Sequence, residues 1–440
     1  MHRQVEKTLS SWKNDPNRYP LLVRGARQVG KSYSIEQFGK QAFENLVTIN
    51  FEFQPQLKSC FTTLDPIDII NKIQILLGQE VHAGKTLLFL DEIQECPQAI
   101  MSLRYFKEKC PEQAVIGAGS LLEFALKKEG LHIPVGRIQF LHIAPLSFSE
   151  FLEALGHQKI LEYLTSYQLA NEIDNDIHLQ CLELLRLYLI LGGMPAILNA
   201  YFENHDLMKC SYIQTSLLQT FRADFGKYAN TPIHKYLEKV FDAAPRLVGQ
   251  RIKYVSIDTN MKSRDIKNAI DMLALAEVIH PIYHSVATGL PLGAEVNEKK
   301  FKLSFLDVGL MQNSCGLNSR LSMESNFIQI NSGAVAEQFV GHELLAYANS
   351  YQQKQLFFWA RDKKNSQAEV DYIIDIDSKI IPIEVKSGKT GRLKSLKLFM
   401  DEKKSDFGVR ISQDKLTFSN QILSIPLYMI EQIPRLVKSL

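Results

Sequence analysis

The chain has 440 residues, which is too long for one ordinary hydrophobic core and predicts two or three domains. Hydrophobic residues make up 45% and charged residues 22% of the chain, as in a soluble globular protein. The 50 basic and 48 acidic residues leave a formal net charge of +2, which excludes a globally basic nucleic-acid binder, so that any basic surface must be local.

The six cysteines are scattered and form no C-x-x-C pair, which favours reduced thiols and excludes a zinc framework. The N-terminus lacks the apolar core of a signal peptide, and no stretch is apolar for long enough to span a membrane. We therefore expect a cytoplasmic protein that does not enter a membrane.

Residues 1–145 alternate between strand and helix patterns, which predicts a doubly wound parallel sheet of the α/β class. Helices are expected between the strands, for example over Pro66–Leu77 and Ala99–Cys110. The expected strands are Pro20–Arg24, Leu46–Phe51, Thr86–Asp91, Val115–Ala118 and Ile138–Ile143.

A phosphate-binding loop of the form G-x-x-x-x-G-K-[ST] follows the first of these strands and precedes a helix expected from Ser32 to about Phe43. Its two glycines let the backbone curl, and the helix N-terminus directs N–H groups at an anion. Lys31 can reach the β- and γ-phosphate oxygens, and the Ser32 hydroxyl can bind Mg²⁺. The loop predicts a nucleoside triphosphate site made of Gly25, Ala26, Arg27, Gln28, Val29, Gly30, Lys31 and Ser32.

A second motif, Leu87–Glu92, is an apolar strand that ends in two acids. Such a run is typical of a central parallel strand, whose carboxyl end faces the ligand crevice. Asp91 is then placed to hold Mg²⁺ through its water shell, opposite Ser32, and Glu92 to polarise the attacking water. The alternative, a solvated strand exit, is disfavoured because two matched motifs occur in the right order.

The pattern turns helical after the first domain and predicts a lid over residues 146–228, interrupted at Gly192–Pro195. Residues 229–310 read as helices followed by two strands, the winged-helix pattern. Ser263–Leu275 would be its recognition helix, and two readings remain open: DNA binding, or a packing module between domains. We favour the packing module, because the helix carries acids as well as bases.

Residues 331–440 form the fourth expected unit, in which two strands on either side of Asp375–Lys379 read as a β-hairpin. A turn at Asp377-Ser378 would bring Asp371 opposite Glu384, with Lys386 on the same face as Glu384. Such a site could hold Mg²⁺, activate water and cleave a phosphodiester, and Glu337 on the preceding helix could complete the metal shell.

The alternative for this hairpin is an ordinary edge with a surface salt bridge of small energy. A run of bases without acids follows it and could bind phosphates or form a solvated helix face. These bases are Lys386, Lys389, Arg392, Lys394 and Lys397.

Over nearly its whole length, the chain resembles the bacterial and archaeal AAA-type ATPases that join a P-loop core to a C-terminal domain of unknown function with a restriction-endonuclease-like, PD-(D/E)xK-type hairpin. The residues that carry this resemblance are Gly25–Ser32, Leu88–Glu92, Gly119-Ser120, Gly136-Arg137, Pro145–Phe148, Gly192–Pro195, Asp307–Leu310, Glu369–Asp371 and Glu384–Lys386.

The resemblance implies ATP and Mg²⁺ as cofactors, a sensor role toward the γ-phosphate for Ser120, and a role as arginine finger or sensor for Arg137. Together with the motifs, it predicts an ATP-hydrolysing switch that acts on DNA or RNA and carries a nuclease-like domain. The alternative is an ATP-gated switch that recruits a protein partner through a catalytically inactive C-terminal domain. Oligomers are possible in either case.

Overall fold

The structure of the protein is a computed structural model. The residues that the structure describes are 1–120, 122, 130, 136–228, 231–317, 332–353, 355–363, 366–386 and 393–440. The chain divides into two compact units. The first unit is Met1–Ala144 with a short piece that begins at Asn349, and the second is Pro145–Ala348 with Gln355–Leu440.

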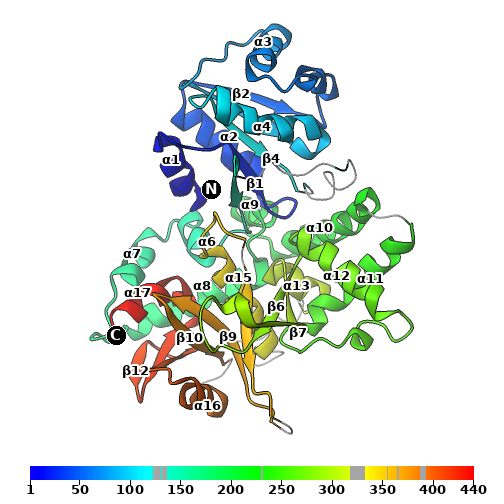
Figure 1. Ribbon diagram of the computed structural model, residues 1–440. Helices are drawn as coiled ribbons and strands as arrows, with labels where there is room; N and C mark the ends of the chain where they lie inside the picture. The colour runs from blue at the N-terminus through cyan, green and yellow to red at the C-terminus, as the bar shows by residue number, and fades with distance from the viewer. Residues whose placement is uncertain are drawn as a thin grey trace. The chain divides into compact units, whose positions relative to one another are not determined.

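The first unit is built on a five-stranded sheet in the order β2-β3-β4-β1-β5 (Figure 1). Every neighbouring pair in this sheet is parallel, which confirms the parallel α/β sheet expected from the sequence. The internal strand β3 is buried along its whole length, because both faces of the sheet are covered. The strands are β1 (Leu21–Arg24), β2 (Asn45–Asn50), β3 (Thr86–Asp91), β4 (Ala114–Ala118) and β5 (Gln139–His142).

The helices of the first unit begin and end at residues suited to those positions. In α3 (Pro66–Leu77), Asp65 accepts a hydrogen bond from the Ile67 amide at the start, and Gly78 ends the helix with a left-handed φ of 65°. The other helical elements are α1 (Val5–Asn14), α2 (Lys31–Ala42), α4 (Pro97–Lys109) and the 3₁₀ segments η1 (Pro55–Phe61) and η2 (Ile93–Glu95).

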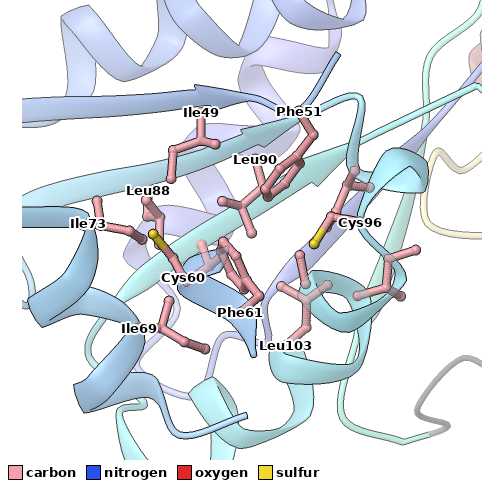
Figure 2. Close-up of a cluster of buried hydrophobic side chains, with 14 of the residues drawn as sticks. Ile49, Phe51, Cys60, Phe61, Ile69, Ile73, Leu88, Leu90, Cys96 and Leu103 are labelled. Carbon is pink, nitrogen blue, oxygen red and sulfur yellow. The ribbon is translucent and has the colours of Figure 1, made fainter. Parts of the chain in front are cut away.

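One face of this sheet packs against η1, α3 and α4 in a single hydrophobic core (Figure 2). Alternate residues of β3, Leu88 and Leu90, point into this core, and the rings of Phe51 and Phe61 meet edge to face with centroids 5.4 Å apart. The core includes Leu90 and Ile93, which stand on either side of Asp91 and Glu92 in the sequence, so it helps to fix the position of these two acids.

The second unit begins as a helical region and ends as a sheet with helices. Among the described residues, no single helix is both long enough and apolar enough to cross a membrane. One pair of consecutive helices, α8 and α9, has that length and apolarity when taken together, but the pair is bent by 119°. The helices are α6 (Phe148–Ala154), α7 (Gln158–Ser166), α8 (Asn175–Leu191), α9 (Pro195–Asn204), α10 (Leu207–Tyr228), α11 (Thr231–Leu247), α12 (Ser263–Leu275), α13 (Val308–Ser314), α15 (Ser332–Ala346), α16 (Lys394–Lys403) and α17 (Ile433–Lys438), with 3₁₀ segments η3 (Tyr254–Ser256), η4 (Leu292–Glu295) and η6 (Leu427–Gln432).

The sheet of the second unit is mixed and has eight strands in the order β12-β13-β11-β10-β9-β8-β6-β7. The strand pair expected to close a separate winged-helix domain is β6 and β7. It is not confined to the middle region, because β6 pairs in parallel with β8 and so extends the C-terminal sheet. The strands are β6 (Ile279–Ser285), β7 (Val296–Phe305), β8 (Leu356–Ala360), β9 (Glu369–Ile376), β10 (Lys379–Val385), β11 (Gly408–Ser412), β12 (Thr417–Ser419) and β13 (Ile422–Pro426).

The hairpin of β9 and β10 turns where the sequence predicts. Asp377 and Ser378 have φ values of 50° and 64°, the two positive values that a two-residue type I′ turn requires. The antiparallel register runs from Ile376 opposite Lys379 to Tyr372 opposite Ile383. This register brings Asp371 level with Glu384 at the far end of the hairpin, as expected.

A buried aspartate joins two of the sequence motifs in the second unit. Asp307 accepts hydrogen bonds from the amides of Gly193 (2.6 Å) and Leu310 (2.9 Å), and burial raises its pKa to about 6. A Cβ on Gly192 would lie 2.1 Å from its Oδ1 atom, so this position requires glycine. The Gly192–Pro195 and Asp307–Leu310 motifs are therefore packing features here.

A second buried acid links the start of α6 to α15. Ser147 and Glu150 form a capping box at the N-terminus of α6, and the Phe148 amide donates to both carboxyl oxygens of Glu343, at 3.1 and 3.2 Å. Glu343 is 1% exposed, and this burial raises its pKa to about 8. The helical region and the C-terminal region thus share one buried polar junction.

Candidate functional site

The loop between β1 and α2 is shaped by two glycines. Gly25 has a φ of 148°, and a Cβ there would lie 2.3 Å from the carbonyl oxygen of Ile143. Gly30 has a φ of 91° and is the N-cap of α2, whose first turn has no side-chain cap. No side chain caps the N–H groups of that turn, so they can bind an anion.

Lys31 folds back over this loop. Its Nζ donates to the carbonyl oxygens of Gly25 (2.9 Å) and Ala26 (2.8 Å), and the residue is buried. Phosphate oxygens could replace these two acceptors, because the ammonium already lies at the loop that would hold them. Between Ala26 and Gly30, Arg27 is half-buried, Gln28 is exposed with a φ of 63°, and Val29 is buried.

The acid predicted to hold Mg²⁺ meets the loop hydroxyl directly. Ser32 Oγ donates to Asp91 Oδ1 at 2.8 Å, and Asn50 Nδ2 donates to the other carboxylate oxygen, Oδ2, at 2.9 Å. Burial raises the pKa of Asp91, while these two hydrogen bonds lower it and so favour the charged form. A hydroxyl and a carboxylate are thus held together at the carboxyl end of β3.

Glu92 follows Asp91 in a left-handed conformation with a φ of 48°. Its Oε2 accepts a hydrogen bond of 2.5 Å from Gln94 Nε2, and Gln94 is itself buried. A left-handed φ is costly for a residue with a side chain, so the surrounding structure must hold Glu92 in this position.

Ser120 lies just beyond β4, whose last residue, Ala118, pairs with Asp91. The buried Ser120 hydroxyl oxygen makes no hydrogen bond within the described part of the chain. Its place at the same edge of the sheet as Asp91, with hydrogen-bonding capacity to spare, fits the expected sensor role.

Arg137 lies elsewhere in the first unit. It lies two residues before β5, which begins at Gln139. Gln139 pairs with Leu21, the first residue of β1, so Arg137 is at the edge of the sheet where these strands begin. The phosphate loop follows Arg24 at the carboxyl edge, roughly 10 Å away at ~3.3 Å per strand residue. Arg137 instead pairs with Glu108 at 3.2 Å on the surface. This placement does not support a role for Arg137 toward the phosphates of its own chain.

The residues at this edge of the sheet fit a magnesium–nucleotide complex. The loop supplies an ammonium and helix N–H groups for phosphate, and Ser32 and Asp91 supply the oxygen ligands that Mg²⁺ prefers. Oxygen ligands and a small number of direct protein contacts are what Mg²⁺ bound to a triphosphate requires.

Two of the three acids expected to form the nuclease centre, Glu337 and Asp371, meet around a lysine in the second unit. Lys302 of β7 is 1% exposed, and its Nζ lies 3.2 Å from Glu337, 2.5 Å from Glu369 and 3.5 Å from Asp371. Burial alone would lower the pKa of Lys302, but these carboxylates outweigh it and raise the pKa. Burial and the nearby Asp371 raise the pKa of Glu337 to about 8.

The remaining residues of the expected centre are paired with each other. Lys386 Nζ donates to Glu384 Oε1 at 2.6 Å, and Asp371 Oδ2 accepts from the Val385 amide at 2.8 Å. Burial and the nearby Asp371 raise the pKa of Glu384 to about 7. Its second oxygen, Oε2, is buried without a hydrogen-bond partner among the described residues. Within the described part of the chain, Glu337, Asp371 and Glu384 do not form a group arranged to hold a metal ion.

Three family matches follow one another along the chain. Residues 17–152 match the family described as AAA domain, and this match contains the loop, Asp91, Glu92 and Ser120. Residues 182–321 and 332–429 match two families described only as domains of unknown function, DUF8612 and DUF4143.

The chain carries an AAA-type P-loop ATPase domain followed by two domains of unknown function. No curated protein matches the chain. Similar solved structures include the Aeropyrum pernix ORC1 protein in complex with DNA (11% identity, 73% of this chain and 94% of that chain, TM-score 0.30). A second is a STAND protein with a tetratricopeptide repeat sensor from Pyrococcus horikoshii (13% identity, 78% of this chain and 45% of that chain, TM-score 0.26). A third is the Thermotoga maritima RuvB Holliday junction branch migration motor (15% identity, 67% of this chain and 91% of that chain, TM-score 0.26).

Three residues of the first unit that the motifs do not contain also shape the site. Asn50 binds Asp91, Gln94 binds Glu92, and Arg3 donates to the carbonyl oxygens of Val29 (2.9 Å) and Ala144 (2.7 Å). Asn50 and Gln94 carry a weak signal in the sequence, since each lies at or just after the end of a core strand. Arg3 carries none, because its partners are 26 and 141 residues away.

Proposed function

We propose that this protein binds ATP with Mg²⁺ and hydrolyses it to drive a change of conformation. The observation that carries the proposal is the 2.8 Å hydrogen bond from Ser32 to Asp91, beside the buried Lys31. It joins the two motifs of a P-loop ATPase in one place, within the residues that match the AAA domain.

In this proposal Lys31 binds the β- and γ-phosphate oxygens, Ser32 and Asp91 hold the metal, and Glu92 orients the attacking water. When bound, Mg²⁺ neutralises the charge that develops on the phosphates. Ser120 contacts the γ-phosphate through its unpartnered hydroxyl. Positioning and electrostatics then supply the rate.

The proposal of a conformational switch is supported by what the phosphate loop touches within the first unit. Gly25 lies against Ile143, and Arg3 joins Val29 of the loop to Ala144, the last residue before the chain leaves this unit. The His142 amide donates to Ser350, in the piece of chain that returns from the second unit. Movements of the loop on ATP binding would therefore reach the segments that connect the units.

Calorimetry of the full chain with ATP and Mg²⁺ tests the binding step. We expect Lys31→Ala to abolish binding, because the ammonium is the main charge facing the phosphates. Lys40→Ala on the exposed side of α2 is the matched control and should bind as the wild type does. Absence of binding by folded wild-type protein would overturn the proposal.

Trapping of ATP tests the hydrolysis step. Glu92→Gln should retain ATP binding and lower turnover by at least about 100-fold, as expected when a general base is removed. Glu95→Gln is the matched control, since Glu95 is exposed and pairs only at the surface with Lys58 at 3.5 Å. Undiminished ATPase activity in both Lys31→Ala and Glu92→Gln would contradict the assignment.

A cytoplasmic switch that acts on nucleic acid is the finer form of this proposal, and it has limited support in the second unit. On α12, Arg264 is exposed but lies 3.6 Å from Asp265, and Lys267 pairs with Asp271 at 3.0 Å. Lys389 and Arg392 of the basic run lie outside the described residues. Stimulation of ATPase activity by DNA or RNA that weakens with salt would support this form. Stimulation only by a protein fraction would favour the partner-binding alternative.

We further propose that residues 331–440 have a restriction-endonuclease-like arrangement, supported by the β9–β10 hairpin and its Asp371, Glu384 and Lys386. The occupation of the carboxylate cluster by Lys302 favours the form of the proposal in which this domain is catalytically inactive. Incubation with DNA or RNA and Mg²⁺ tests this, and cleavage lost in Asp371→Ala would contradict it.

A further inference from the structure

Lys302 lies at the centre of a carboxylate cluster built from three elements. The lysine is on β7, an edge strand of the sheet that comes before the C-terminal family match in the sequence. The acids come from α15 (Glu337) and β9 (Glu369, Asp371). The lysine side chain is 1% exposed, whereas the three acids are 14–22% exposed. The ammonium is thus the most buried charge of the group.

We propose that Lys302 is the resident cation of this cluster, so that the second unit holds no divalent metal there. The cluster then works as a metal-independent ion-pair junction between the middle region and the C-terminal region. The proposal concerns the second unit alone and does not depend on ATP binding by the first.

Space and charge at the cluster leave no room for both the lysine and a metal ion. Carboxylate oxygens of three residues lie 2.5 to 3.5 Å from Nζ, the distances at which an ammonium makes hydrogen bonds and ion pairs. A divalent ion bound to the same oxygens at ~2.1 Å would have to share their centre with a positive charge in a buried site. The lysine and the metal are therefore mutually exclusive.

The neighbouring acids have partners within the protein. Asp371 Oδ2 accepts a hydrogen bond from the Val385 amide, and Glu384 Oε1 accepts one from Lys386. Within the described ranges, no group of three or more His, Cys, Asp or Glu side chains is arranged to hold a metal ion.

The cluster connects two regions of the chain. Glu369 also forms an ion pair of 2.5 Å with Arg251, which, like Lys302, precedes residue 310. Two bases of the middle region thus bind acids that come after residue 331. Removing one partner of a buried pair is costly, because the other charge is left uncompensated. Such a junction fixes one region to the other without any cofactor.

A titration of the nucleotide-free full chain with Mn²⁺ tests the proposal. Bound Mn²⁺ is measured as the loss of the electron paramagnetic resonance signal of the free ion. We expect wild type and Asp371→Asn to bind the same amount of Mn²⁺. We expect Lys302→Met to gain one Mn²⁺ per chain, with affinity at least about 10-fold above any wild-type site in this unit, because the acids become available to a hard cation. The gain should disappear in Lys302→Met combined with Asp371→Asn.

Lys300→Met is the matched control, since Lys300 lies on the same strand but is exposed and pairs with Asp362. It should gain no Mn²⁺. Thermal unfolding gives a second readout: Mn²⁺ should raise the melting temperature of Lys302→Met and leave that of Lys300→Met at its metal-free value.

Two results would overturn the proposal. One is a Mn²⁺ ion bound by wild type and lost in Asp371→Asn, a comparison that holds even where Lys302→Met does not fold. The other is a folded Lys302→Met chain that gains no Mn²⁺, because the ammonium would then not be what excludes the metal.

Discussion

Gln94 donates a hydrogen bond to Glu92 at 2.5 Å, across one residue of a 3₁₀ turn. The other atom of the same amide, Gln94 Oε1, is buried without a partner among the described residues and faces Gly119, where a Cβ would lie 2.3 Å away. One glutamine therefore connects the proposed general base with the strand end that carries Ser120.

We predict that Gln94→Ala lowers the turnover of ATP by about 10-fold while ATP affinity stays near the wild-type value. The reason is that Glu92 loses the donor that orients it, whereas Lys31 and Ser32 keep their contacts, and misplaced general bases lose part of a 10²- to 10⁴-fold contribution. Steady-state kinetics with calorimetry separates the two effects. Gln98→Ala, an exposed change on α4, is the control. Equal losses of affinity and turnover would speak against a positioning role for Gln94.

Asn50 gives a prediction about the metal. Asn50→Ala removes the hydrogen bond to Asp91 Oδ2, so the buried carboxylate loses a group that favours its charged form. We expect a higher Mg²⁺ requirement for ATP binding and a loss of about 1 kcal/mol in the free energy of unfolding. Titration of Mg²⁺ at fixed ATP and urea unfolding measure these changes. Asn45→Ala on the same strand is the control, and an unchanged Mg²⁺ requirement in Asn50→Ala would contradict the prediction.

Arg3 gives a prediction about the phosphate loop. Arg3→Met removes the charged donor that holds Val29 and Ala144, and hydrogen bonds to charged groups contribute about 1.5–3 kcal/mol. We expect the dissociation constant for ATP to rise at least several-fold, with the fold retained. Arg104→Met is the control, because Arg104 is on the surface of α4, where it pairs with Glu108 and lies over the ring of Tyr105. The prediction fails if the two variants bind ATP equally well.

Glu343 gives a prediction about pH. Its pKa is about 8 in the folded chain and about 4.5 when unfolded, so the folded state holds the proton more tightly and unfolding releases it. The free energy of unfolding of the wild type, relative to Glu343→Gln, should fall as the pH rises from 4.5 to 8, by at most about 1.4 kcal/mol per unit. Urea unfolding of both proteins across this range measures the difference. A difference that stays constant with pH would show that the carboxyl is ionised throughout.

Local patterns predicted the first unit well. The five strands of its sheet begin and end within one residue of the positions expected from the sequence, because a buried parallel strand is an uninterrupted apolar run. The phosphate loop and Asp91 also meet as expected, since parallel strands present their carboxyl ends at one edge. The turn at Asp377-Ser378 and the resulting register followed from the polar tract between two apolar arms.

Contacts between distant parts of the chain could not be predicted in this way. Lys302 reaches Glu337, Glu369 and Asp371 across 35 to 69 residues, and nothing near it in the sequence indicates an acidic partner. The pairing of β6 with β8 was missed for the same reason, because two helices and two strands also fit a winged helix when read locally. The role of Arg137 was inferred from the family resemblance alone. The Gly136-Arg137 motif does not show where the chain before β5 lies, so the surface pairing of Arg137 with Glu108 could not be predicted.

The pairing of β6 with β8 also bears on any attempt to study the C-terminal region by itself. A fragment of residues 332–440 lacks β6, so Leu356, Phe357 and Phe358 of β8 would lie on an open strand edge. The acids Glu337, Glu369 and Asp371 would also lose the base that they share, Lys302. Open apolar edges join other chains, and like charges repel. Such a fragment should aggregate on expression.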